Sequence, residues 1–116
     1  MKSSHFMDGY SEQALIPAED GFYDKLDIDF RPPTPEQWAR MVDAHPHHTA
    51  IFAVALETLP ELVTGWNAKD ASGKQVPVTK ASFTRLHPKL LLALSNTVYG
   101  FTKNTLRPAV EADLKN

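Results

Sequence analysis

The chain has 116 residues, of which 42% are hydrophobic and 22% are charged, and these values are typical of one small globular domain. Its formal net charge of −2 gives no bulk attraction to nucleic acid or to an anionic membrane, and we expect neither as a partner. The absence of cysteine excludes disulfides, thiolate metal sites and cysteine nucleophiles.

The N-terminal segment is polar, weakly patterned and interrupted by Gly9, Pro17 and Gly21. It lacks the apolar core of a signal peptide. No stretch of the chain approaches the ~18 apolar residues that a membrane-spanning helix needs. We predict that residues 1–21 form an extended, mobile arm and that residues 22–116 form a single α+β domain.

Apolar and acidic residues alternate from Leu26 to Phe30, which predicts a half-buried strand. Leu26, Ile28 and Phe30 are expected to point inward, and Asp27 and Asp29 to face solvent. The two prolines that follow cannot donate to a sheet and should end the strand.

Thr34 is followed by Pro35 and, at the third helical position, by Gln37, which together predict a capped helix start. This helix should run to about Ala44, where His45-Pro46 stops it. The side chains that we expect it to bury are Trp38, Met41 and Val42.

A second helix is predicted to begin near Thr49 and to kink or end at Pro60, because the proline ring opposes the carbonyl of Leu56. Its apolar residues form one broad stripe at helical spacing. They are Ile51, Phe52, Ala55, Leu56, Leu59 and Leu62.

A short β-hairpin is predicted around Trp66–Val78, with arms Leu62–Ala68 and Gln75–Val78. Asp70 and Gly73 in the connecting loop suit a type I turn followed by a residue with positive φ.

Two helices should follow this hairpin. Thr79 can cap a short helix over residues 80–86, and Pro88 can open a longer one over about 88–101, ended by Gly100 or Asn104. A final short helix is predicted after Arg107. On the long helix the expected buried face consists of Leu91, Leu94, Val98 and Phe101, with Leu90 at its edge. The fold class is therefore a small, mostly helical α+β domain.

The order of motifs from Phe30 onward resembles that of the tail assembly chaperones of long-tailed bacteriophages and prophages. Phe30–Pro33 reads F-R-P-P between a strand and a helix, and Val63–Asn67 reads V-x-G-W-N after a helix. Asp70–Thr79 reads D-x-x-G-K-x-V-P-V-T, and Phe83–Leu91 reads F-x-R-L-x-P-x-L-L. The first 21 residues take no part in this resemblance.

The resemblance implies a protein without catalytic activity or cofactor that works in the cytoplasm of a bacterial host. It would bind the tape measure protein, help to recruit tail tube subunits and be absent from the finished virion. Two alternatives remain open. One is a structural head–tail or tail-completion subunit that stays in the virion, and the other is a small metal-binding protein using His45, His47 and His48. The sequence predicts no oligomeric state.

A chaperone for a helical partner needs an exposed apolar stripe or groove. Leu92 and Tyr99 lie seven residues apart on the long helix, away from its expected core face, and are the first candidates. Val54 is similarly off the main stripe of its helix. Trp66 is either a core anchor of the hairpin or an exposed contact residue. The alternative for Leu92, Tyr99 and Val54 is burial in a small bundle.

Other chemistry has little support. The histidines at 45, 47 and 48 lie in a proline-broken loop without a distant cysteine or histidine to complete a metal site. Asp27 and Asp29 share the wet face of one strand, where they cannot flank a substrate. Ser72-Gly73-Lys74 lacks the order of a phosphate-binding loop. We therefore predict no catalytic residues and no metal site.

Overall fold

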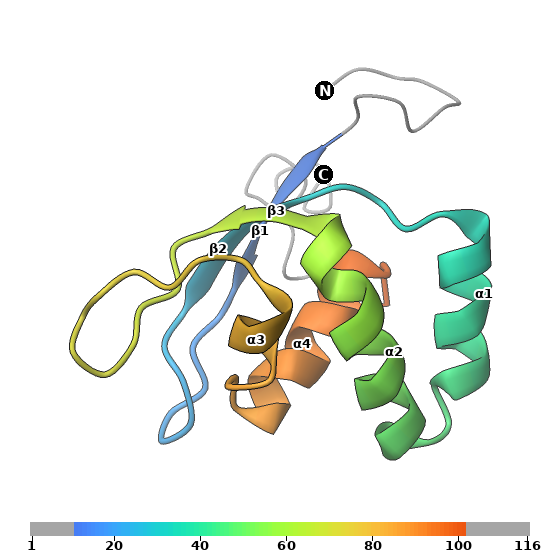
Figure 1. Ribbon diagram of the computed structural model, residues 1–116. Helices are drawn as coiled ribbons and strands as arrows, with labels where there is room; N and C mark the ends of the chain where they lie inside the picture. Colours follow the sequence, from blue (N-terminus) through green and yellow to red (C-terminus); the bar gives the residue numbers. More distant parts are fainter. Residues whose placement is uncertain (1–10, 102–116) are drawn as a thin grey trace, which may run out of the picture.

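The computed structural model describes residues 11–101 of the chain. Within them, helices lie on one side of an antiparallel sheet with strand order β1-β2-β3, and the predicted α+β class is confirmed (Figure 1). The elements are, in chain order, β1 (Glu12–Ile16), β2 (Leu26–Phe30), α1 (Pro35–Ala44), α2 (His48–Leu62), β3 (Val63–Trp66), α3 (Lys80–Phe83) and α4 (Pro88–Val98).

The central strand β2 has the bounds and the orientation that its alternation predicted. Leu26, Ile28 and Phe30 are all buried, whereas Asp29 is exposed and Asp27 is partly buried. Ile28 pairs with Ala14 of β1 on one side and with Trp66 of β3 on the other. The sheet thus presents one apolar face to the helices.

The predicted arm is wrong for residues 11–21, and residues 1–10 lie outside the described residues. Glu12–Ile16 form β1, and Ala14 and Ile16 are among the most deeply buried side chains. The turn after β1 is also held, because Glu19 accepts a hydrogen bond from Lys89 Nζ on α4 at 3.0 Å. Residues 12–16 are ordered because they pair with β2, an interaction that the local sequence pattern does not indicate.

Helix α1 starts and stops where its sequence predicts. Thr34 Oγ1 accepts from Gln37 N at 3.2 Å while Gln37 Oε1 accepts from Thr34 N at 2.9 Å, which completes the capping box. The helix ends before His45, and α2 begins at His48 after a short loop. Helix α2 passes through Pro60 and ends two residues later, where the chain turns directly into β3.

The predicted hairpin is present only in part. β3 pairs with β2, and the two predicted arms meet farther along, where Val76 N–H donates to Ala68 O at 2.9 Å. The loop after β3 is closed by one isolated bridge between Lys69 and Gln75 and by the Trp66 indole N–H, which donates to Val76 O at 2.7 Å. The turn prediction within it is confirmed: Gly73 has φ +84° and its N–H donates to Asp70 O at 2.9 Å.

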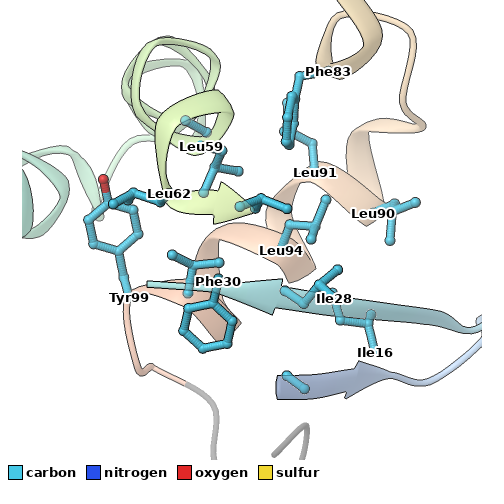
Figure 2. Packing of buried hydrophobic residues seen from close by; sticks show 14 of the residues in the cluster. Ile16, Ile28, Phe30, Leu59, Leu62, Phe83, Leu90, Leu91, Leu94 and Tyr99 are labelled. Atoms are coloured by element: carbon cyan, nitrogen blue, oxygen red, sulfur yellow. The ribbon is translucent and has the colours of Figure 1, made fainter. Parts of the chain in front are cut away.

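Helices α3 and α4 follow their predicted caps. Thr79 Oγ1 accepts from Ser82 N at the start of α3, which is shorter than predicted, and Pro88 opens α4. Figure 2 shows side chains from α4 and α2 facing Ile28 and Phe30 across the core. Helix α1 lies outside this layer and packs on α2 (Figure 1).

Candidate functional site

An open apolar hollow of about 710 Å³ lies between α1, the loop after it and the end of α4. We call it the Trp38 groove. It is lined by Trp38, Val42, His45, Pro46, Asn96 and Phe101. Trp38, Val42 and His45, the residue that follows α1, form one wall of the groove. They lie on one stripe because they are four and three residues apart.

The prediction that α1 buries Trp38 and Val42 is wrong. Met41 and Ala44 occupy the buried face of the helix, while Trp38 is 46% exposed and Val42 is 38% exposed. A helix has one face toward its neighbour, and the stripe of Met41 and Ala44 lies to one side of the stripe of Trp38 and Val42. The second stripe is left to solvent.

Trp38 is nevertheless held in place. Its indole N–H donates to Tyr99 O at 3.2 Å, across 61 residues of sequence. Because Tyr99 is the residue at which α4 ends, this bond ties the exposed ring to a fixed point of the fold. The aromatic face of the groove is therefore pre-organised in spite of its exposure.

Phe101 reaches the groove through a Schellman motif at the end of α4. Its N–H donates to Asn96 O at 2.7 Å, the Gly100 N–H donates to Thr97 O at 3.2 Å, and Gly100 has φ +79°. This turn sets the ring centroid of Phe101 6.2 Å from that of Trp38 and 4.9 Å from that of His45. The Phe101 side chain remains 36% exposed.

Tyr99, a predicted contact residue, is buried and 3% exposed, so the prediction of an exposed Leu92–Tyr99 face is wrong at this position. Its hydroxyl lies 2.7 Å from Thr58 Oγ1 on α2. In Figure 2 the ring of Tyr99 points from the end of α4 toward Leu62. Burial raises the pKa of the Tyr99 phenol, and the hydrogen bond with Thr58 opposes that rise.

The other predicted contact residues are also part of the packing. Trp66 is buried and tilts against Phe83 with ring centroids 4.9 Å apart, which supports the core-anchor alternative. Leu92 and Val54 are partly buried and pack on the core cluster. Leu92 lies one helical turn before Asn96 on α4, so the predicted face runs toward the Trp38 groove without forming its wall.

One of the predicted histidines, His45, makes an aromatic contact. His45 meets the Phe101 ring edge-on at 4.9 Å. Among the side chains that the structure describes, no three of the histidine, cysteine, aspartate or glutamate types gather as metal ligands would. Asp27 and Ser72 also have local roles, because Asp27 Oδ2 accepts from Asn67 Nδ2 at 3.3 Å and Ser72 Oγ donates to Asp70 Oδ1 at 2.6 Å.

Sequence reasoning missed the groove because it assigned Trp38, Val42 and Phe101 to the core. The available signal was the width of the apolar surface on α1: Trp38, Met41, Val42 and Ala44 span more of a short helix than one neighbouring helix covers.

Comparisons of the chain with protein-family models, with curated proteins and with solved structures gave no match. None of the helices described between residues 11 and 101 combines the length and the apolar character needed to cross a bilayer.

Proposed function

We propose that this protein is a phage tail assembly chaperone-like protein that binds a helical segment of the tape measure protein in the Trp38 groove. In this role it helps to recruit tail tube subunits in the cytoplasm of the bacterial host. Two features support the proposal: the order of sequence motifs from Phe30 to Leu91, and a surface suited to gripping another polypeptide.

The observation that carries the proposal is the clustering of exposed apolar side chains. Among residues 11–101, four large hydrophobic side chains are exposed, and three of them line the Trp38 groove. The three are Trp38, Val42 and Phe101, and the fourth is Phe22. Single exposed apolar residues are normal on a protein surface, whereas a group of them around one hollow is typical of an interaction site.

The groove is also suited to binding because its aromatic residues are fixed before a partner arrives. The bond from Trp38 to Tyr99 O and the Schellman turn at Gly100 restrict the two rings that flank the hollow. Side chains that are already fixed lose less conformational entropy on binding, so the entropic cost of binding is lower. Aromatic side chains in such positions are common binding hot spots.

Co-expression with the tape measure protein tests the proposal. We expect the two proteins to co-purify, and we expect Phe101→Ala to weaken the complex at least tenfold because it removes one wall of the groove. Phe22→Ala is the control, since it removes another exposed phenylalanine, 47% exposed against 36% for Phe101, from the turn after β1. If wild-type protein recovers no tape measure protein, the proposed function is wrong.

Mass spectrometry of purified virions separates this function from that of a structural subunit. We expect the protein to be absent from finished particles and present in lysates during tail assembly. Stoichiometric amounts in the particle would favour a head–tail or tail-completion subunit. Calorimetry with zinc on untagged protein tests the metal-binding alternative, and a dissociation constant below ~100 μM would support it.

A further inference from the structure

We infer that the segment after α4, residues 104–116, docks in the Trp38 groove as a short amphipathic helix and leaves it when a partner helix binds. The docking itself does not depend on which partner binds. Its consequence for binding rests on the proposed function, because the segment then competes with the tape measure protein for the same surface.

The chain leaves the described residues at a wall of the groove. Phe101 is the last residue that the structure describes, and it lines the hollow. The turn at Gly100 brings it there and sets its ring centroid 4.9 Å from that of His45. Thr102 is bonded to Phe101, so the following residues start at the groove itself. The other segment outside the described range, residues 1–10, is attached to Ser11, which does not line the groove.

The segment after Phe101 carries apolar residues at intervals of four, which place them on one stripe of a helix. They are Leu106, Val110 and Leu114. The helix predicted after Arg107 falls within this segment and lies outside the described residues. The stripe would be about 12 Å long, and the wall from Trp38 to His45 is about 10.5 Å long, so the two match in length.

The connection is long enough for the segment to fold back along the groove. Phe101 and Leu106 are five residues apart, and an extended chain of that length spans up to about 17 Å. This reach exceeds the length of the wall, so Leu106 can meet either end of it. The connecting residues, Thr102–Thr105, are all polar and need no burial of their own.

The charges of the groove and of the segment are compatible with docking. No lysine, arginine, aspartate or glutamate is among the described residues that line the hollow. On a helix of 100° per residue, Arg107 and Asp113 border the apolar stripe on its two sides, and Glu111 and Lys115 lie farther round. Docking the stripe therefore covers apolar side chains and leaves the charged ones at the edge or in solvent.

Covalent attachment makes even a weak contact effective. A short tether gives an effective concentration of about 1 mM, so a stripe with an intrinsic dissociation constant of about 0.25 mM fills the groove in about 80% of molecules. A competing partner then finds the groove open in about one molecule in five, and its apparent affinity falls about fivefold.

Quenching of tryptophan fluorescence by acrylamide tests whether the segment covers Trp38. Trp66 is 8% exposed, so quenching of the folded protein reports mainly on Trp38. We expect Leu106→Asp combined with Val110→Asp to raise the Stern–Volmer constant about twofold over wild type, because the groove is then uncovered. The same pair of substitutions in a Trp38→Phe background should leave the constant unchanged.

A synthetic peptide with the sequence of residues 104–116 tests the site of docking. In an NMR titration we expect it to bind the Leu106→Asp/Val110→Asp protein with a dissociation constant of about 0.25 mM, and wild type about fivefold more weakly because the attached segment competes. Adding Phe101→Ala to the variant should weaken binding of the peptide further, since it removes a wall of the groove.

A matched variant separates the stripe from its charge. Ala112→Asp combined with Asn116→Asp adds the same charge on the opposite side of the segment, and should behave as wild type in both measurements. Circular dichroism confirms that each variant is folded. Equal quenching of wild type and the stripe variant, or failure of the peptide to bind the stripe variant, would overturn the inference. Similar effects of the two charge variants would overturn it as well.

Other occupants of the groove would give different results, and each contradicts the inference. A dimer that Leu106→Asp/Val110→Asp dissociates would show docking into a second copy. A rise in quenching after Phe6→Asp combined with Met7→Asp, and not after the stripe variant, would assign the groove to residues 1–10.

The affinity for the tape measure protein tests the competition. The stripe variant should bind it about fivefold more tightly than wild type does, and equal affinities would overturn the inference. Quenching and the peptide titration need no tape measure protein. If that protein does not bind at all, the proposed function fails while the docking stands or falls on those two measurements.

Discussion

The hydroxyl proton of Tyr99 is directed to Thr58. Thr58 Oγ1 donates its own proton to Val54 O at 2.9 Å, so in the 2.7 Å contact with Tyr99 the phenol must be the donor. We expect Tyr99→Phe to lower the free energy of unfolding by about 1 kcal/mol, because one buried hydrogen bond is lost while Thr58 keeps its other partner. Urea unfolding measures this change.

Thr58→Val is the informative counterpart, because it leaves the buried Tyr99 donor without its acceptor. An unsatisfied buried donor costs about 1–3 kcal/mol, so this variant should be the less stable of the two. The reverse order of stability would show that the proton is directed the other way.

The same side chain predicts an alkaline limit to stability. Burial raises the pKa of Tyr99 above its ordinary value of 10.0, so the folded protein keeps the phenol proton to higher pH than the unfolded chain does. Stability from this group is therefore complete below pH 10 and falls as the pH rises beyond it. In urea unfolding between pH 8 and pH 11, Tyr99→Phe should lose less stability than wild type, and parallel curves would refute this assignment.

The end of α4 determines where Phe101 lies. Gly100 has φ +79°, and a Cβ built there would contact no other atom within 4 Å, so the cost of a side chain is one of backbone conformation alone. We expect Gly100→Ala to destabilise the fold by about 1–2 kcal/mol in urea unfolding. Gly100→Asn should cost less, because asparagine tolerates this conformation better.

The consequence for the groove follows from the Schellman bonds. If the helix end opens in Gly100→Ala, Phe101 leaves its position over Trp38 and His45, and binding of a partner helix weakens with stability. A Gly100→Ala protein with wild-type stability and binding would show that another contact holds the ring.

Local signals were enough to predict the elements that local interactions specify. The alternation of Leu26–Phe30, the caps at Thr34 and Thr79 and the turn at Gly73 all depend on neighbours within a few residues, and all are present in the structure. These features fix the start of each element but not what packs against it.

Contacts distant in sequence decided the rest. Strand β1 has no clean alternation, because Leu15 follows Ala14 and precedes Ile16, and its order comes from pairing with β2. Trp66 pairs with Ile28 in the sheet, so the hairpin expected after it is reduced to one bridge, between Lys69 and Gln75. Packing between α1 and α2 likewise decides which stripe of α1 is buried. The local sequence does not specify that packing, and for this reason it did not predict the groove at Trp38.

Three carboxyl groups, two that link separate elements and one within a loop, predict how the molecule responds to acid. Hydrogen bonding and the charge of Lys89 lower the pKa of Glu19, and Arg40 lowers that of Glu57, in each case from an ordinary value of 4.5. The hydroxyl of Ser72, followed by the backbone N–H of Lys74, lowers the pKa of Asp70 from 3.8. These contacts join the β1–β2 turn to α4, join α1 to α2 and close the loop after β3.

A lowered pKa means that the folded state favours the ionised carboxylate, so its contribution to stability is present above the unfolded value and disappears as the pH falls through the folded one. We therefore expect urea unfolding to give a constant stability from pH 6 to about pH 5 and a decline below pH 4.5. Glu19→Gln combined with Glu57→Gln should be less stable at pH 6 but lose less on acidification. If the stability of this variant falls equally steeply in acid, other groups cause the loss of stability at low pH. The ion pairs of Glu19 with Lys89 and of Glu57 with Arg40 would then contribute little to it.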